Sequence, residues 1–265
     1  MRCFYCKKIS IGEAELDNSE LAHIFNVLKL KAGEEILLND CHGTLATAKI
    51  TNSKKVIPIE VKKIPEPKTK IFLFVSPPRK QQLDKIITQC CEVGVWSINL
   101  IKTEYSVSIP AEKDEKIERW QTRIIEACKQ SHNPYAPEIF PPITFNEALK
   151  KVKNKNLTAF FGTTSLEHPT SLADAMRQHP GRSGTGQGEQ ANIPGRLQAT
   201  TARAGQHSTS NRVNVAWFVG PEGGFSPKEQ SAMIENNFTP LTLGNWIMRV
   251  ETATVVGAAL LQKLG

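Results

Sequence analysis

Two glycine-containing segments in the C-terminal part of the chain carry the residues best suited to binding a ligand. In the first, the apolar run Val213–Val219 leads into Gly220-Pro221-Glu222-Gly223-Gly224, and a helix start follows at Ser226. Glycines let the backbone approach a ligand closely, and ligands bind at the carboxyl ends of parallel strands. A strand, a glycine turn and a helix also form ordinary tight connections, so this segment alone leaves its role open.

The second segment, residues 241–254, repeats this arrangement. A strand leads to Gly244, an apolar loop with Ile247 and Met248 follows, and a helix begins near Arg249. Two such loops from successive strands could frame one ligand, with Ile247 and Met248 as apolar walls. Arg249 and Glu251 would then lie at the mouth of the site. In a purely structural interpretation they are a first-turn helix pair, with Glu251 favoured by the helix dipole.

The elements around both segments alternate between strand and helix from Thr69 onward. This alternation predicts a mostly parallel sheet covered by helices on both faces. Ser226-Pro227-Lys228-Glu229 is an S-x-x-E capping box with proline at the first helical position, so a helix should begin here. The expected strands are 71–75, 97–102, 157–161, 213–219 and 239–243, and the expected helices are 79–92, 114–129, 227–235 and 249–264.

Residues 1–67 are predicted to form a separate β-rich unit. The stretches 35–39, 44–51 and 56–63 are typical of strands, and residues 19–30 place apolar side chains on one helical face. Ile64-Pro65-Glu66-Pro67 is a stiff linker and the natural boundary. The expected domains are therefore 1–67 and 68–265.

Residues 177–212 interrupt the second domain. They are rich in Gly, Gln, Ser, Thr and Ala and contain almost no large apolar residue, so they cannot build a core. They hold five Arg and no Lys, whereas the rest of the chain holds five Arg and 23 Lys. We expect a disordered inserted loop that is not part of the active site.

The composition indicates a folded cytosolic protein. The 265 residues carry a net charge of +7, but residues 176–212 contribute five basic side chains against one acidic, so charge is weak support for a nucleic-acid partner. Neither a secretory signal nor an apolar span of about 20 residues is present, so we expect no membrane association. Cys3 and Cys6 lack the second pair that a four-thiolate zinc site needs, and we expect reduced thiols and no metal.

The two glycine segments together resemble a known family. GPEGGFS followed by LG-x-x-I-x-R-x-ETA is similar to the bacterial 16S ribosomal RNA uridine-N3 methyltransferases of the SPOUT superfamily. Supporting matches cover nearly the whole chain except 177–212. They are Arg2-Cys3-Phe4, HIFNVLKLKAG at 23–33, Glu92-Val93-Gly94-Val95, Thr103-Glu104-Tyr105-Ser106 and Gln130-Ser131.

The resemblance implies a fold and a set of partners. An N-terminal PUA-like RNA-binding β-barrel would precede a C-terminal α/β domain with a trefoil knot, which the usual rules for chain connections would not predict. The chain would be a homodimer, with each cofactor pocket near the subunit interface. The implied cofactor is S-adenosylmethionine, and the implied partner is 16S ribosomal RNA or the small ribosomal subunit.

The resemblance also implies roles for individual residues. Arg249 would stabilise negative charge on uracil, and Glu251 would take the N3 proton, with Glu222 as a competing base. The residues expected to bind the cofactor are Phe161, Gly162, Gly220, Glu222, Gly223, Leu243, Gly244, Ile247 and Met248. Those expected to bind RNA are Arg2, Lys29, Arg79, Lys80, Gln130 and Ser131.

Four positions depart from the family's pattern. The chain has Tyr105, Asn133 and Trp246 where the family has Arg, and Lys129 where the family has Glu. The loss of three guanidinium groups puts recognition of phosphates or bases in doubt more than it does the cofactor pocket. Two alternative functions stay open: ribose 2′-O methylation of RNA, and RNA binding without catalysis.

Overall fold

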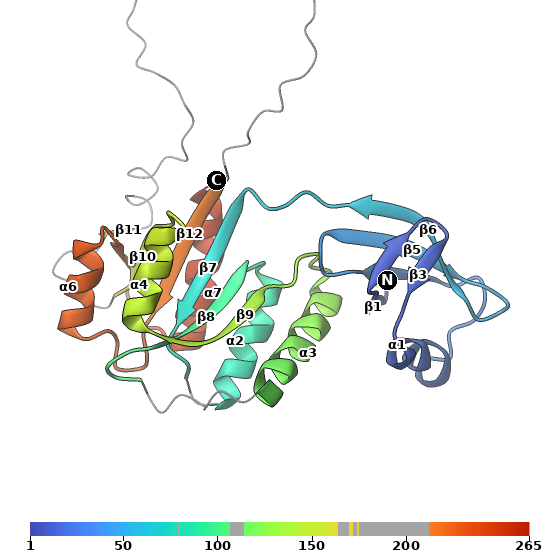
Figure 1. Cartoon of the computed structure of the whole chain (residues 1–265), viewed down its shortest axis with the longest axis horizontal. Coiled ribbons are helices and arrows are strands. Elements are labelled where there is room, and N and C mark those ends of the chain that lie inside the picture. The colour runs from blue at the N-terminus through green and yellow to red at the C-terminus, as the bar shows by residue number, and fades with distance from the viewer. Residues whose placement is uncertain (79, 107–113, 164–169, 172–173, 175–211, 265) are drawn as a thin grey trace, which may run out of the picture.

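A parallel sheet forms the centre of the C-terminal part of the molecule (Figure 1). The computed structural model describes residues 1–78, 80–106, 114–163, 170–171, 174 and 212–264. The strand order is β11-β13-β10-β12-β7-β8-β9, and each neighbouring pair is parallel, as expected from the sequence. The strands are β7 (Thr69–Val75), β8 (Ser97–Lys102), β9 (Glu138–Thr144), β10 (Thr158–Gly162), β11 (Thr170–Ser171), β12 (Val213–Val219) and β13 (Thr239–Thr242).

Helices cover both faces of this sheet, because its central strands are apolar on both sides. Along β7, Ile71 and Leu73 face one core, whereas Phe72 and Phe74 face the other. Such continuous apolar runs are typical of buried parallel strands. The first core contains α2 (Lys80–Glu92), α3 (Asp114–Ser131) and α7 (Val250–Leu261), and the second contains α4 (Phe145–Asn154) and α6 (Pro227–Glu235).

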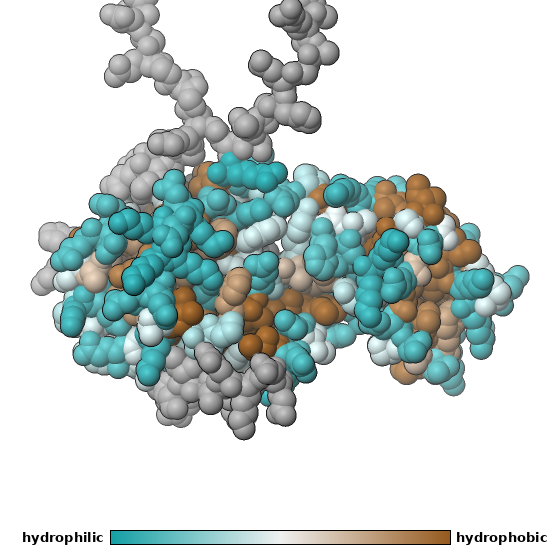
Figure 2. All heavy atoms as spheres, in the orientation of Figure 1, coloured by the Kyte–Doolittle hydropathy of each residue, from teal (hydrophilic) through white to brown (hydrophobic). Residues whose placement is uncertain are grey.

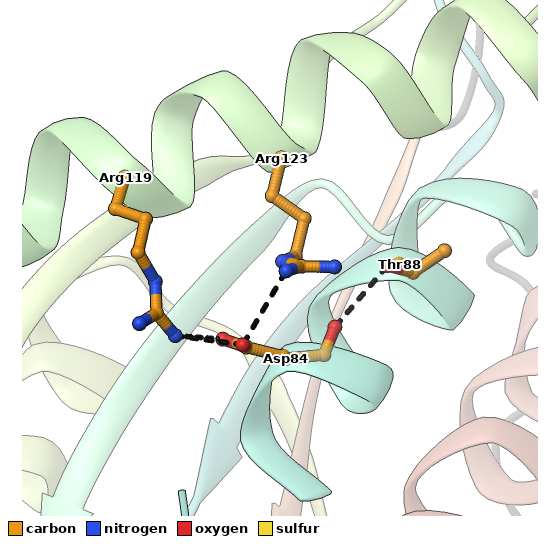
Figure 3. Close-up of polar contacts among 4 residues, drawn as sticks. All are labelled: Asp84, Thr88, Arg119 and Arg123. Carbon is orange, nitrogen blue, oxygen red and sulfur yellow. Dashed lines mark hydrogen bonds and ion pairs between the residues drawn. The ribbon is translucent and has the colours of Figure 1, made fainter. Parts of the chain in front are cut away.

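An ion-pair cluster on the outer side joins α2 to α3 (Figure 3). Nη2 of Arg119 lies 2.7 Å from Oδ1 and 2.6 Å from Oδ2 of Asp84, and Arg123 approaches the same carboxylate at 3.4 Å. The Thr88 hydroxyl donates to the Asp84 carbonyl one turn away. Exposed pairs of this kind contribute little energy. The buried side chains beneath them hold the two helices on the sheet.

The contact between α7 and the sheet is unusually close. The indole of Trp217, on β12, is fully buried and donates from Nε1 to the Ala253 carbonyl at 3.3 Å. A Cβ atom on Gly257 would overlap this indole, so only glycine fits here. A Cβ on Gly162 would lie 3.3 Å from the other end of the ring. Trp217 therefore fixes how β10, β12 and α7 approach one another.

The N-terminal unit contains a smaller sheet of order β1-β4-β5-β6 and a separate β2–β3 hairpin. β1 runs parallel to β4, and the other pairs are antiparallel. One buried cluster fills its interior. The strands are β1 (Cys3–Tyr5), β2 (Lys8–Ser10), β3 (Glu13–Glu15), β4 (Glu35–Asn39), β5 (Thr44–Ile50) and β6 (Val56–Lys63).

The helix expected over residues 19–30 is shorter than predicted and irregular. α1 (Asn18–Ala22) changes into a π-helical turn, η1 (His23–Val27), in which the Leu28 amide donates to the His23 carbonyl five residues back. Lys29 then adopts a left-handed conformation with φ of 52°, which ends the helix. Apolar periodicity gives the buried face of such a segment but not the hydrogen-bond spacing within it.

Several elements were absent from the sequence prediction. These are β1, β2, β3, β9, α4 and the short β11. β9 contains Pro141-Pro142, which suggests a loop, and α4 has a lysine-rich surface that obscures its apolar face. The predicted disordered insert at 177–212 lies outside the described residues apart from Arg212. The path from β10 to β12 runs through undescribed residues, so the trefoil knot and the domain boundary at residue 67 stay predictions.

The cysteines are free thiols, as expected. Cys3 is partly buried and the other five are buried, and desolvation raises the pKa of the Cys3 thiol to about 12. Among the helices described, none is long and apolar enough to cross a membrane.

Replacing Gly257 by alanine should destabilise the protein although alanine is the better helix former. The gain in helix propensity is about 1 kcal/mol, whereas overpacking against the Trp217 indole costs about 1–3 kcal/mol or more. The midpoint of thermal unfolding should therefore fall. Adding Trp217→Phe should recover part of the loss, because the smaller ring relieves the overlap. A Gly257→Ala protein as stable as the wild type would show that this contact does not limit the packing of α7.

Candidate functional site

The predicted ligand loops meet at the carboxyl edge of the large sheet. β13, β10 and β12 are adjacent and parallel, so their carboxyl ends lie side by side. The loop after β12 begins at Gly220, the loop after β13 begins at Leu243, and Thr163 follows β10 between them. The Thr163 amide donates to the Leu241 carbonyl at 3.0 Å. The sheet thus brings the two glycine segments next to the end of β10, which is far from them in the sequence.

The loop after β12 is a tight turn that requires glycine. The Gly224 amide donates to the Pro221 carbonyl at 2.8 Å, and Gly224 has φ of 74°, which favours glycine. A Cβ atom on Gly220 would lie 3.1 Å from the backbone of Gly224 and Phe225. Glu222 and Gly223 are exposed at the tip. Apart from the Glu222 side chain, the turn therefore presents backbone to its surroundings.

α6, the helix that follows this turn, is hydrogen-bonded to the loop after β8. Ser226 and Glu229 form the predicted capping box, in which the Ser226 hydroxyl accepts from the Glu229 amide and the Ser226 amide donates to Oε2 of Glu229. Oε1 of Glu229 accepts from the Glu104 amide at 2.9 Å. Tyr105 covers the turn, because a Cβ on Gly223 would lie 3.5 Å from the Tyr105 Cβ. One buried carboxylate thus joins the loops after β8 and β12.

Three hydroxyl groups hold the strand ends next to this turn. The Ser106 hydroxyl lies 2.8 Å from that of Ser76 and 2.7 Å from that of Thr103, and it accepts from the Thr103 amide. The Ser76 amide donates to the Val219 carbonyl. Hydrogen bonds therefore connect the ends of β7, β8 and β12. The sequence did not predict this cluster. Its one signal was the family match at Thr103-Glu104-Tyr105-Ser106.

The loop after β13 exposes an apolar surface. Trp246 and Ile247 are 86% and 83% exposed, which is unusual for side chains of this size. Met248 folds back toward Gly244, where a Cβ would lie 3.3 Å from its methyl group. Leu243 packs against the main core. This loop therefore leaves its backbone accessible to a ligand at Gly244. None of the described residues covers the apolar side chains of Trp246 and Ile247.

Arg249 and Glu251 lie where this loop enters α7. Arg249 is the N-cap residue of α7, and its side chain is exposed and forms no capping hydrogen bond. Glu251 is half-buried in the first turn. Neither side chain takes part in a salt bridge with the described part of the chain. The two charged groups are therefore available to a ligand at this edge.

The remaining predicted cofactor residues, Phe161 and Gly162, end β10 between the two loops. Phe161 is fully buried in the second core, so only its backbone faces the edge. Gly162 contacts Trp217, as described above. The structure therefore places the predicted cofactor-binding positions on three adjacent strand ends.

The predicted RNA-binding residues lie in three different places. Arg2 and Lys29 are exposed on the N-terminal unit, Lys80 begins α2, and Arg79 lies outside the described residues. Gln130 and Ser131 are exposed at the end of α3, near the opposite edge of the sheet. The Ser131 hydroxyl donates to the Ala127 carbonyl. Those of them that the structure describes form no single surface.

The family comparison matches most of the chain. The family model described as "RNA methyltransferase domain" matches residues 65–262, and "RNA methyltransferase PUA domain" matches residues 16–58. Ribosomal RNA small subunit methyltransferase E of Synechocystis is 26% identical over 262 residues, covering 94% of this chain and 72% of that protein. The protein of the same name from Aquifex aeolicus is 24% identical and covers 96% of each chain.

Solved structures share the fold over its full length. A ribosomal RNA small subunit methyltransferase E from Neisseria gonorrhoeae, solved bound to S-adenosyl methionine, superposes with a TM-score of 0.76 at 25% identity, covering 100% of this chain and 98% of that one. A Legionella pneumophila protein described as a putative methyltransferase has a TM-score of 0.74 at 24% identity, covering 100% and 98%.

Replacing Glu229 by glutamine should lower the midpoint of thermal unfolding more than replacing Glu147, which has the same place in the other capping box. The carboxamide of Glu229→Gln could accept from only one of the two amides that the carboxylate serves, and a buried unpaired amide costs about 1–3 kcal/mol. Glu147 has the same place in the box that begins α4, but it is exposed and serves only the cap. Glu147→Gln should therefore lower the unfolding midpoint less. Equal shifts would mean that the Glu229–Glu104 contact contributes nothing.

Proposed function

Since the chain belongs to the RNA methyltransferase family, we propose that it transfers a methyl group from S-adenosylmethionine to N3 of a uridine in 16S ribosomal RNA. The relatives named ribosomal RNA small subunit methyltransferase E, which match 94–96% of this chain, support a ribosomal substrate. The GPEGGFS and LG-x-x-I-x-R-x-ETA motifs support N3 of uridine as the acceptor. A protein that modifies ribosomal RNA belongs in the cytoplasm.

The observation that carries this proposal is the meeting of three loops at the ends of β13, β10 and β12. Gly220 and Gly244 have no side chain between the backbone and a ligand, and a Cβ would be crowded at Gly220 by the backbone of Gly224 and Phe225. The exposed Ile247 would gain an apolar contact from a bound ligand. These features suit a ligand with both polar edges and an apolar body, such as S-adenosylmethionine. The bound cofactor would supply an electrophilic methyl group on its sulfonium.

The chain's own groups would make the uridine reactive. N3–H of uracil is a weak acid, so the nitrogen becomes a nucleophile only as its proton leaves. We assign Arg249 to the uracil carbonyl oxygens, where its guanidinium would stabilise the developing negative charge. Glu251 would take the proton, and Glu222, exposed at the tip of its turn, is the competing base. Holding the two reactants in line would supply much of the remaining acceleration.

We also propose that the protein acts as a homodimer in which α7 contributes to the interface. α7 is apolar nearly all round, and its half-buried residues include Val255, Val256 and Leu260. A helix apolar on all sides is normally covered on all sides. Dimerisation next to the Leu243–Arg249 loop would also cover Trp246 and Ile247.

Nucleoside analysis tests the reaction directly. We expect the protein to transfer labelled methyl groups to small ribosomal subunits or to 16S RNA from a strain that lacks the corresponding enzyme. Digestion and mass spectrometry should give 3-methyluridine. A ribose-methylated nucleoside would replace the proposal with 2′-O methylation. No transfer together with intact RNA binding would indicate a binding protein without catalysis.

Two variants separate cofactor binding from catalysis. Gly223→Val should abolish cofactor binding in calorimetry without large loss of stability, because a Cβ there meets only ordinary contacts with Tyr105. Arg249→Ala should leave cofactor affinity nearly unchanged and lower turnover by about 100-fold or more, as for loss of a group that stabilises developing charge. Equal losses of cofactor affinity and rate in Arg249→Ala would make it a cofactor-binding residue.

Sedimentation velocity tests the dimer. The wild-type protein should sediment with the mass of two chains, whereas Val256→Asp should shift it toward one, because a buried unpaired carboxylate is costly. Gln121→Asp, at an exposed position on α3, is the control, because Thr252 and Val256 lie on the same face of α7. A wild-type protein with the mass of a single chain would contradict the proposal.

A further inference from the structure

A row of lysine–aromatic contacts lies at the amino edge of the large sheet, away from the glycine loops. Nζ of Lys70 lies 3.5 Å from the ring centre of Trp96, and Nζ of Lys151 lies 3.7 Å from that of Phe140. Nζ of Lys155 lies 5.5 Å from the Phe72 ring. These residues come from four neighbouring elements: β7, the start of β8, β9 and α4. Trp96 directly precedes β8, and Lys155 is the C-cap residue of α4. We call this row the lysine–aromatic strip.

The strip continues into a cavity of about 470 Å³ between the linker and the turns after α2 and α3. Trp96 belongs to both, and its ring contacts that of Tyr135, which also lines the cavity, with 5.6 Å between the ring centres. Exposed Lys68 and the predicted RNA-binding residue Ser131 also line the cavity. The volume falls within the range of about 300–1,000 Å³ that is typical of small-molecule sites.

Thr69, which lines the cavity, carries a polar atom without a partner. The residue is 5% exposed, and its buried hydroxyl oxygen forms no hydrogen bond within the described part of the chain. Buried polar groups are nearly always paired, so such an atom indicates a missing partner. A ligand in the cavity would reach this hydroxyl only after a small shift of the side chains that cover it. This observation is independent of the lysines.

The charges around the strip favour an anionic ligand. Lys151 is half-buried, donates to Oδ1 of Asn99 at 2.7 Å, and has a lowered pKa because of burial and because Lys155 is near. Opposing carboxylates are present: Glu66 pairs with Lys70 and Arg212, Glu138 faces Lys151, and Glu92 lines the cavity. The five cations, Lys68, Lys70, Lys151, Lys155 and Arg212, still outnumber these three carboxylates. Hydrophilic side chains cover the face at which α4 lies (Figure 2).

We propose that the lysine–aromatic strip and its cavity bind single-stranded RNA, with phosphates on the lysines and one unpaired base in the cavity. Alternating cations and aromatic rings are the usual means of binding single strands, because phosphates need charge and bases need flat apolar partners. Trp96 and Tyr135 together provide one aromatic wall of the cavity for the base. This proposal rests on the proposed function only in taking RNA as the substrate.

The surface lies at the opposite edge of the sheet from the methyl-transfer loops. It would therefore hold RNA that flanks the target, rather than the target uridine. Binding there would raise affinity for the substrate without taking part in chemistry. Its loss should weaken RNA affinity and leave the rate at saturating RNA unchanged.

Charge-matched double variants test the strip. Lys68→Gln with Lys155→Gln removes two exposed lysines from it, whereas Lys150→Gln with Lys153→Gln removes two exposed lysines from other sides of α4. Residues two apart do not share a helical face, so Lys153 lies away from Lys151 and Lys155. The probe is a fluorescent 12-nucleotide oligouridylate, and a 12-base-pair RNA duplex is the comparison. Melting temperatures establish that both variants are folded.

We expect the strip variant to bind the single strand about tenfold more weakly, with a salt slope lower by about 1.4, or about 0.7 for each lost phosphate contact. The control variant should change affinity less than twofold, and the duplex should bind weakly to all proteins. Photocrosslinking of 4-thiouridine RNA should label the peptides that contain Trp96 or Tyr135. Equal losses in the two variants, or crosslinks confined to other peptides, would overturn the proposal.

The methyl-transfer assay separates this proposal from the function itself. If wild-type protein methylates ribosomal RNA while the strip variant binds RNA normally, only the proposal for the lysine–aromatic strip is wrong. If no methyl transfer occurs but the strip variant loses RNA affinity, the catalytic function is wrong and the strip stands. A lower rate of the strip variant at saturating RNA would place these lysines in the catalytic step and contradict the role proposed here.

Discussion

The packing of Trp217 against Gly257 is the constraint on which the rest of the catalytic domain depends. Its indole is fully buried between β12 and α7, and its far end reaches Gly162 at the end of β10. Because residue 257 has no side chain, α7 lies closer to the sheet than a helix with a larger residue there could. This close approach places the first turn of α7, with Arg249 and Glu251, close to the sheet. The proposed site is thus positioned by a contact that takes no part in the chemistry.

A second, polar set of contacts holds the N-terminal unit on the catalytic domain. Lys129 on α3 forms a buried ion pair with Glu20 on α1 at 2.7 Å, and the Asn39 side chain donates to the Asn133 carbonyl. Asn133 in turn donates to the Cys91 carbonyl and accepts from the Tyr135 amide. Lys129 and Asn133 are two of the departures from the family's pattern. In this protein both residues have structural roles at the junction of the N-terminal unit and the catalytic domain. A buried ion pair there contributes more to fixing the orientation of the two units than to stability.

The two edges of the large sheet present different chemistry. At the carboxyl edge, glycine turns expose backbone and Trp246 and Ile247 expose apolar surface, which suits a cofactor and a protein interface. At the amino edge, lysines lie on aromatic rings, which suits a polyanion. An RNA that reached both edges would be held at a distance from the reacting base. Such a division lets affinity and catalysis be adjusted by different residues.

The sequence by itself determined the family, the parallel sheet and the elements with strong local signals. Glu35–Asn39, Val56–Lys63, Ser97–Lys102, Val213–Val219 and Pro227–Glu235 have the bounds that apolar runs and the Ser226 capping box predicted. Weak local signals failed at β9, where prolines suggest a loop, and at η1, where periodicity does not report hydrogen-bond spacing. Only the tertiary structure decided which distant segments meet. It joined Glu229 to Glu104, placed Trp217 on Gly257, and built the cavity from residues 64–69, 92–96 and 131–135. Local sequence records which face of an element is apolar, whereas the partner of that face depends on how the whole chain closes around it.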